Sequence, residues 1–129
     1  MARIAVMGAG SWGTAFALVL ADAGNEVRIW GRRDEVCRSI NERHENAEYL
    51  PGVELPATVS ATTDAAAALD GVEMAVLAVP SQQLRSNLEA WGEHIGDRVV
   101  MVSLMKGVEL GSDDDANACA MRFAKSGDI

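Results

Sequence analysis

The sequence predicts an α/β fold in which a doubly wound, mainly parallel sheet forms a single domain. Two observations predict it. Short apolar runs alternate with stretches of helical periodicity along most of the chain, and the first apolar run ends in a cluster of glycines that a helical pattern follows at once. The 129 residues suffice for one domain with a buried core, but not for a second domain of similar size.

The first strand, helix and strand occupy about 30 residues, the usual length of a βαβ unit. Residues 2–7 are apolar apart from Arg3 and stop at Gly8, a pattern typical of a buried parallel strand. Residues 14–23 are mostly small or apolar and precede Gly24, a residue type that often ends a helix. Residues 25–30 alternate between polar and apolar side chains and predict the second strand.

The rest of the chain repeats this alternation. We expect Asp34 to cap a polar helix that reaches about residue 45, and prolines to mark a loop after it. Thr63 or Asp64 is expected to cap an alanine-rich helix that ends at Gly71. The predicted strands lie at 58–62, 72–79 and 99–104, and the predicted helices at 34–45, 65–69 and 81–95.

A glycine pattern lies between the first predicted strand and helix: Gly8, Ala9, Gly10, Ser11, Trp12 and Gly13. The spacing G-x-G-x-x-G between a strand and a helix is the dinucleotide-binding fingerprint and makes the predicted fold Rossmann-type. We expect Gly8 to allow a tight turn, Gly10 to let the backbone approach a pyrophosphate, and Gly13 to let the helix pack closely on the sheet. The first helical amides would then bind the phosphates. The alternative is a glycine-rich turn in another kind of α/β protein.

The second predicted strand ends in Trp30-Gly31-Arg32-Arg33, where NAD-preferring sites usually place an acid that bonds the ribose 2′-hydroxyl. Two guanidiniums can instead bind a 2′-phosphate through paired, charge-assisted hydrogen bonds. Asp34 competes for the acid's role by its spacing, but we interpret it as a helix cap. The sequence therefore predicts that NADP(H) binds well. The alternative for Arg32 and Arg33 is a solvated pair at the end of a strand.

Two more segments follow predicted strands at the edge of the sheet where ligands bind in open α/β folds. Pro80 and Ser81 end the fourth strand, and Ser81 taken alone would cap the next helix. Lys106 follows the fifth strand, where its ammonium could attract an anionic substrate, although a Lys-Gly pair is also common in exposed turns. Taken alone, His44 and Tyr49 are expected to be a solvated helix-end histidine and a loop aromatic packed on the sheet.

Composition and charge exclude several classes of partner. The formal net charge of −8 disfavours nucleic acid, whose binding depends on lysine and arginine. The apolar stretches fall short of the roughly 18 residues of a membrane helix, and the N-terminus lacks the pattern of a signal peptide, so we expect a cytoplasmic protein without membrane insertion. Cys37 and Cys119 stand far apart without metal-ligand spacing, and we expect reduced thiols and no metal site.

Taken together, four stretches resemble the NAD(P)-dependent glycerol-3-phosphate dehydrogenase family in its bacterial form. The resemblance covers residues 3–110 and is far more specific than the glycine pattern alone. Its stretches are GAGSWGTA at 8–15, His44-Glu45-Asn46 with Tyr49-Leu50-Pro51-Gly52, Val79-Pro80-Ser81, and SLMKGVE at 103–109.

The resemblance implies reversible hydride transfer between NADP(H) or NAD(H) and dihydroxyacetone phosphate, which yields sn-glycerol 3-phosphate for phospholipid synthesis. It also implies that Lys106 contacts both the nicotinamide side of the cofactor and the phosphorylated substrate. The candidate cofactor-binding residues are Gly8, Gly10, Ser11, Trp12, Gly13, Arg32, Arg33, Tyr49, Pro80 and Lys106.

The resemblance also leads us to expect that one part of the enzyme is missing. Residues 1–110 are expected to form the dinucleotide-binding domain, and 111–129 a divergent tail in which Ser112 could cap a helix. The family's C-terminal helical domain, with its general acid/base lysine, would be absent, so we expect no catalytic residue in this chain. Hydride transfer also needs a proton donor near the ketone oxygen, and the chain alone is therefore expected to be inactive. Its partner would be a C-terminal half or further copies of itself.

Two other functions remain as alternatives. A cofactor-binding module without catalysis, such as a redox sensor that acts through a partner chain, would carry the same glycine pattern. Another phosphate- or hydroxyacid-linked dehydrogenase would share the same domain, although the stretch from His44 to Gly52 argues against it.

Overall fold

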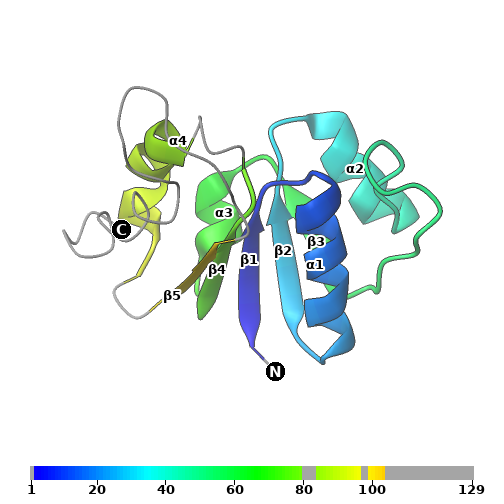
Figure 1. The fold of residues 1–129 in the computed structure, drawn as a ribbon, viewed down its shortest axis with the longest axis horizontal. Helices are drawn as coiled ribbons and strands as arrows, with labels where there is room; N and C mark the ends of the chain where they lie inside the picture. Colours follow the sequence, from blue (N-terminus) through cyan, green and yellow to red (C-terminus); the bar gives the residue numbers. More distant parts are fainter. Residues whose placement is uncertain (1, 80–83, 97–98, 104–129) are drawn as a thin grey trace.

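The computed structural model describes residues 2–79, 84–96 and 99–103, which form a five-stranded parallel sheet with helices on both faces (Figure 1). The strand order is β3-β2-β1-β4-β5, the order of the first five strands of the Rossmann dinucleotide-binding fold. The predicted fold class is confirmed. The elements are β1 Arg3–Met7, α1 Ser11–Asp22, β2 Glu26–Trp30, α2 Asp34–Arg43, β3 Val59–Thr62, α3 Ala65–Leu69, β4 Met74–Leu77, α4 Leu84–Trp91, a 3₁₀ turn Gly92–His94 and β5 Val100–Ser103.

The sheet is buried on both faces, and its central strand shows how the sequence produces this. Successive side chains of a strand point to opposite faces. In β1, Ile4 and Val6 belong to an apolar cluster with residues of α1 and α2, whereas Ala5 and Met7 pack with residues of α3 and α4. A central strand that is covered on both sides must be apolar at successive positions, which explains the continuous run seen in the sequence.

The parallel register brings the carboxyl ends of three strands together. Met7 of β1 pairs with Trp30 of β2 on one side and with Leu77 of β4 on the other. The chain segments that follow these strands therefore begin at the same edge of the sheet. The glycine pattern follows β1, and the two arginines follow β2. This edge is where open α/β sheets bind ligands.

Helix boundaries differ from the predictions where capping, not apolar periodicity, decides them. Helix α1 begins at Ser11, three residues before the predicted start. Its first residues, Ser11, Trp12 and Gly13, lie outside the run of small and apolar residues from which the start was predicted. The predicted cap at Asp34 is wrong: Asp34 is the first residue of α2, the N-cap is Arg33, and the Asp34 carboxylate accepts two hydrogen bonds from Arg38 at 2.7 and 2.8 Å. Asp64 does cap α3, since its side chain accepts a hydrogen bond from the amide of Ala66 at 3.0 Å.

One predicted strand is shorter in the structure, and one predicted helix is only partly described. Strand β4 spans four residues instead of the predicted eight, because Val72 and Val79 are buried beside the strand without joining the ladder. The helix predicted over 81–95 includes α4 and the 3₁₀ turn, and its expected start lies outside the described residues. The predicted tail at 111–129 also lies outside them. Within the described ranges, no helix has the length and apolar character needed to cross a membrane.

Candidate dinucleotide-binding site

Gly8 begins the turn from β1 into α1 and touches both neighbouring strands. Its φ of +136° lies where side chains are strongly disfavoured, and a Cβ there would lie 2.4 Å from the carbonyl oxygen of Ala78. Its amide donates to the carbonyl of Trp30 at 2.9 Å. Gly8 thus holds the turn against the chain just after β4, and any larger residue would push the turn away from it.

Gly13 and Gly10 have opposite surroundings. A Cβ on Gly13 would lie 2.2 Å from the carbonyl oxygen of Gly8 and 3.2 Å from the Cβ of Ala78, so the absent side chain lets α1 approach the sheet. A Cβ on Gly10 would have no atom of the described residues within 4 Å. Packing against the described part of the chain does not require a glycine at position 10, and the open space beside it lets a ligand approach the backbone.

The amides at the start of α1 face this space without protein acceptors in the described part of the chain. Gly10 is the N-cap, no side chain caps the helix, and the first turn carries no acidic residue. The amides of Ser11, Trp12 and Gly13 precede the first residue that bonds back within the helix, Thr14, whose amide donates to Gly10 at 3.0 Å. Three donors and the positive end of the helix dipole are thus available to an anion.

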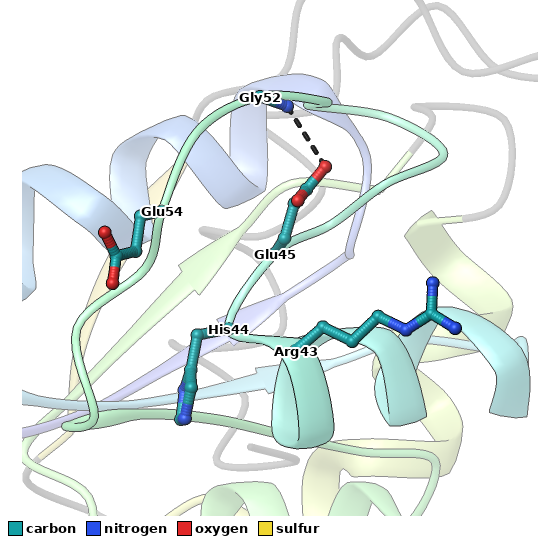
Figure 2. A pocket seen from close by; sticks show the side chains of 5 residues that line it. All are labelled: Arg43, His44, Glu45, Gly52 and Glu54. Carbon is teal, nitrogen blue, oxygen red and sulfur yellow. Dashed lines mark hydrogen bonds between the residues drawn. The ribbon is translucent and has the colours of Figure 1, made fainter.

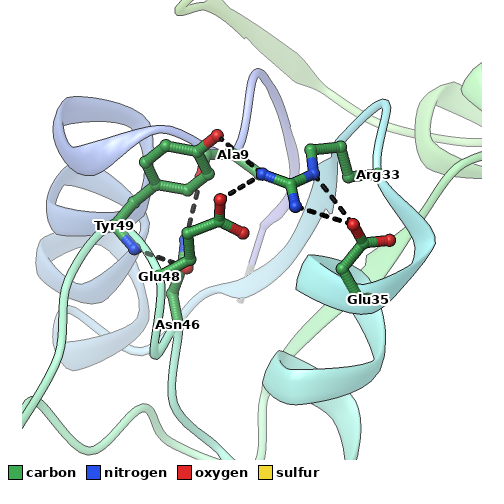
Figure 3. Close-up of polar contacts among 6 residues, drawn as sticks. All are labelled: Ala9, Arg33, Glu35, Asn46, Glu48 and Tyr49. Carbon is green, nitrogen blue, oxygen red and sulfur yellow. Dashed lines mark hydrogen bonds and ion pairs between the residues drawn. The ribbon is translucent and has the colours of Figure 1, made fainter.

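Asn46 fixes the loop after α2 against this glycine turn. The residue is almost fully buried, and its amide nitrogen donates to the carbonyl of Ala9 and to the hydroxyl of Thr14, both at 2.8 Å. Its side-chain oxygen accepts from the amide of Tyr49 at 3.1 Å, as Figure 3 shows. The Ser11 hydroxyl donates to the carbonyl of Tyr49 at 2.7 Å. The loop therefore lies beside the start of α1 and is tied to it at several points.

Arg33 lies between two carboxylates and a phenol at the end of β2 (Figure 3). Its Nε and Nη2 donate to Glu35 Oε1 at 3.0 and 2.7 Å. Its Nη1 donates to Glu48 Oε1 and, at 3.4 Å, to the hydroxyl of Tyr49. These hydrogen bonds, that of Glu35 first, raise the pKa of Arg33 above its already high value. The pKa of Glu35 is lowered, first by a hydrogen bond from its own backbone amide and then by Arg33.

The remaining predicted residues differ in how far the structure places them. Arg32 is exposed next to Arg33 and makes no ion pair with another described residue. Trp12 leaves 82% of its surface exposed at the start of α1, and Tyr49 leaves 39% exposed. Pro80 and Lys106 lie outside the described residues. The structure therefore brings the glycine pattern, Arg33 and Tyr49 to one edge of the sheet.

A pocket of about 290 Å³ lies at the end of α2, and its polar side chains do not converge on a common point. Its lining is Arg43, His44, Glu45, Gly52 and Glu54. In Figure 2 the side chains of Arg43, His44 and Glu54 point in different directions, and the Glu45 carboxylate accepts a hydrogen bond from the Gly52 amide at 3.1 Å. His44 adopts a left-handed conformation, with φ of 55°, that ends α2. Its role is to turn the chain, as a helix-end residue.

Sequence reasoning missed Asn46 and Glu48 as parts of the site. Asn46 stood within a stretch that carried the family resemblance, which was the available signal. Its contact partner, the carbonyl of Ala9, lies 37 positions away in the sequence. No local pattern marks Glu48, because its partner Arg33 belongs to another segment.

Comparison with known proteins agrees with this geometry. Residues 3–127 match the family described as NAD-dependent glycerol-3-phosphate dehydrogenase N-terminus. The chain is 61% identical over 110 residues to the glycerol-3-phosphate dehydrogenase [NAD(P)+] of Streptomyces griseus, which covers 85% of this chain and 33% of that protein. The corresponding enzyme of Corynebacterium urealyticum is 58% identical over 109 residues, with 84% and 33% covered.

Solved structures give the same result. The crystal structure of glycerol-3-phosphate dehydrogenase from Coxiella burnetii superposes with a TM-score of 0.87 at 32% identity, over 95% of this chain and 38% of that one. The yeast enzyme from Saccharomyces cerevisiae gives 0.83 at 27% identity, with the same shares covered. The chain thus spans about a third of the length of the curated relatives it matches. By this match across nearly its whole length, the chain belongs to the NAD-dependent glycerol-3-phosphate dehydrogenase family, as its N-terminal, cofactor-binding part.

Proposed function

We propose that this chain binds NADPH and NADH as the cofactor domain of an enzyme that interconverts dihydroxyacetone phosphate and sn-glycerol 3-phosphate. The observation that carries the proposal is the open face of Gly10. Among the described residues, a Cβ there would meet no atom within 4 Å, and the three helix-start amides beside it have no acceptor. A glycine that packing does not require is explained by a ligand that touches its backbone.

The surrounding residues fit a dinucleotide phosphate. The pyrophosphate would accept hydrogen bonds from the amides of Ser11, Trp12 and Gly13. Arg32 and Arg33 follow β2, on the side where the adenosine ribose lies in this fold, and their guanidiniums suit a 2′-phosphate. The remaining proposed cofactor contacts are Gly8, Tyr49, Pro80 and Lys106. The proposed binding of the cofactor needs no metal ion.

The bound nicotinamide would supply a hydride to the ketone carbon of the substrate. This chain would hold the cofactor in place, and Lys106 would balance the charge of the substrate phosphate and polarise the ketone. The proton for the ketone oxygen would come from the remaining two-thirds of the enzyme, since the relatives are about three times as long as this chain. We further propose that the complete enzyme is cytoplasmic, serves phospholipid synthesis and is a homo-oligomer.

A cofactor titration tests the binding part of this proposal. NADPH and NADH are titrated into the chain while nicotinamide fluorescence is recorded, and we expect saturable binding of both. Arg32→Ala and Arg33→Ala should each weaken NADPH about 10-fold or more, because a hydrogen bond to a charged group contributes about 1.5–3 kcal/mol, and should leave NADH within about twofold. Equal losses for both cofactors would contradict the assignment of the 2′-phosphate site.

Complementation tests the enzymatic part. Reduction of dihydroxyacetone phosphate is assayed with the chain alone and with the C-terminal two-thirds of the Streptomyces griseus relative added as a separate polypeptide. Turnover only in the mixture, with NADPH consumption matched by glycerol 3-phosphate formed, would support the proposal. Cofactor binding with no turnover in the mixture would favour a non-catalytic binding module instead.

A further inference from the structure

We propose that Glu48 helps set the choice between NADPH and NADH by occupying the part of the Arg33 guanidinium that a 2′-phosphate would need. The inference rests on the proposed function, because it concerns a cofactor bound at the same edge of the sheet. It adds a specificity-determining residue from a loop that does not contain the arginines.

The hydrogen bonds of Arg33 leave little capacity for a phosphate. A guanidinium has five N–H groups. Glu35 accepts from Nε at 3.0 Å and from Nη2 at 2.7 Å, while Glu48 and Tyr49 accept from Nη1. One N–H, on Nη2, is left without an acceptor among the described residues. A phosphate held by two parallel hydrogen bonds needs two donors, so it must displace one of these acceptors.

Glu48 is the acceptor that a phosphate would displace. Figure 3 shows Glu35 on one side of the Arg33 guanidinium and Glu48 with Tyr49 on the other. Glu35 is two positions from Arg33 in the chain and holds two of its nitrogens, which makes it an anchor. Glu48 belongs to the loop that Asn46 ties to the glycine turn, so it lies on the side where a cofactor would run from pyrophosphate to ribose.

Displacement of Glu48, unlike that of Glu35, leaves Arg33 with a pair of N–H groups that can bind a phosphate. It frees an Nη1 hydrogen next to the remaining Nη2 hydrogen, and these two point in parallel from the end of the guanidinium. Displacement of Glu35 would instead release the arginine from its anchor. The Glu48 carboxylate would also stand close to a phosphate of similar charge, so it opposes NADPH through competition for Arg33 and through repulsion.

NADH has neither problem. It brings no phosphate to this position, so the Arg33–Glu48 pair stays intact and no cation is left without a partner. The pair therefore lowers the affinity for NADPH while leaving the affinity for NADH nearly unchanged. Both side chains are partly exposed, at 46% for Arg33 and 40% for Glu48, so the effect is that of a surface ion pair and is weakened by salt.

The test compares Glu48→Gln with the unaltered chain by fluorescence titration of NADPH and NADH at low ionic strength. Glutamine keeps the size of the side chain and removes its charge. The ratio of Kd for NADH to Kd for NADPH should rise about two- to fivefold, the range for a partly exposed ion pair, and the rise should shrink in high salt. NADH serves as the internal reference, because errors in folded fraction cancel in the ratio.

Glu73→Gln is the matched control for the loss of one negative charge. Glu73 is exposed and precedes β4, at the opposite edge of the sheet from the glycine turn, and its variant should keep the original ratio. Glu48→Ala, which removes the hydrogen bond as well as the charge, should raise the ratio at least as far as Glu48→Gln.

The outcomes separate the two proposals. A ratio that stays the same or falls in both Glu48 variants, while the chain binds both cofactors, overturns the role of Glu48 and leaves the proposed function standing. A folded chain that binds neither cofactor overturns the proposed function, and this inference falls with it. A rise of the same size in Glu73→Gln would show a general charge effect and also overturn the inference.

Discussion

Replacement of Gly10 by alanine should abolish most cofactor binding and leave the fold intact. The backbone of Gly10 has φ of −76° and ψ of −173°, a conformation that alanine adopts without strain, and the new Cβ would meet no atom of the residues that the structure describes within 4 Å. Alanine is a poorer N-cap than glycine by about 0.5–1 kcal/mol, whereas the stiffer unfolded chain contributes about 0.4–1 kcal/mol in the other direction. The free energy of unfolding should therefore change by less than about 0.5 kcal/mol.

The loss of binding follows from the same geometry. The Cβ would stand in the space through which a pyrophosphate must approach the amides of the first helical turn. A hydrogen bond to a charged group contributes about 1.5–3 kcal/mol, so the loss of one raises Kd about 10- to 150-fold. NADPH and NADH should be affected equally, because both carry the pyrophosphate.

Gly13→Ala provides the contrasting variant. Its Cβ would lie 2.2 Å from the carbonyl oxygen of Gly8, which real contacts do not allow, so α1 must move away from the sheet. Alanine gains about 1 kcal/mol in helix propensity over glycine. Overpacking of about 1–3 kcal/mol outweighs this gain, and the variant should be destabilised by up to about 2 kcal/mol.

Urea unfolding followed by circular dichroism and fluorescence titration with NADPH are measured on both variants. A folded Gly10→Ala chain that binds NADPH as tightly as the unaltered one would refute the reasoning, because the open face of Gly10 would then have no ligand. Destabilisation of Gly10→Ala by as much as Gly13→Ala would refute it as well, since it would show a packing role for Gly10.

Three further predictions concern the support of the site and the fold. Asn46→Ala should lower the free energy of unfolding by about 1–3 kcal/mol in urea denaturation, because it removes two hydrogen bonds, one to the half-buried carbonyl of Ala9 and one to the buried hydroxyl of Thr14; an unchanged midpoint would contradict the role of this side chain. Asp64→Ala should cost about 1 kcal/mol in the same assay by removing the hydrogen bond to the Ala66 amide, whereas Asp64→Asn should lose much less. Burial raises the pKa of the Cys37 thiol, so its contribution to stability is complete below the pKa of an unfolded thiol and is lost as the pH rises through the higher, folded pKa. In a Cys119→Ser background, thiol labelling at pH 8 should be at least about tenfold slower in the folded chain than in urea. Equal labelling rates would contradict this prediction.

The fold could be predicted because the strands of this sheet have recognisable local sequence patterns. Strand β1 is covered on both faces, so its apolar run is continuous and stops where the glycine turn begins. The small residues of α1 reflect the close packing that Gly13 and Ala17 permit against the sheet. In each case the sequence pattern and the packing have the same cause.

Helix starts were harder to predict because side-chain type alone does not decide a cap. Asp34 and Asp64 both precede or begin a helix, and both are residues that favour the N-cap. Asp64 caps α3 because its backbone is extended, with φ of −96° and ψ of 108°. At α2 the extended residue is Arg33, so Asp34 falls one position inside the helix and pairs with Arg38 four residues later.

Within the candidate site, the local sequence predicts residues that are needed for their backbone conformation. It does not predict residues that are needed for a contact with a distant segment of the chain. Gly8 was predicted from the turn it must make, and its φ of +136° meets that expectation. Gly31 is not predicted as a required glycine, although a Cβ there would lie 2.9 Å from the Cβ of Ala9. This crowding arises between two turns that meet only in the folded chain. Asn46 belongs to the same class, since its partners precede it by more than 30 positions.

The loop around Asn46 matters because it connects the two ends of the candidate site. A turn closed by the Leu50 amide on the carbonyl of Asn46, at 2.8 Å, carries Glu48 and Tyr49 between these two residues. One end of this turn is fixed to the glycine turn through Asn46, and its middle reaches Arg33. The spacing between the first amides of α1 and Arg33, the proposed contacts of the pyrophosphate and the 2′-phosphate, is thus supported by a segment with no helix or strand of its own. If Asn46→Ala releases the turn, Glu48 loses its hold on Arg33, and the NADPH preference should shift in the same direction as in Glu48→Gln.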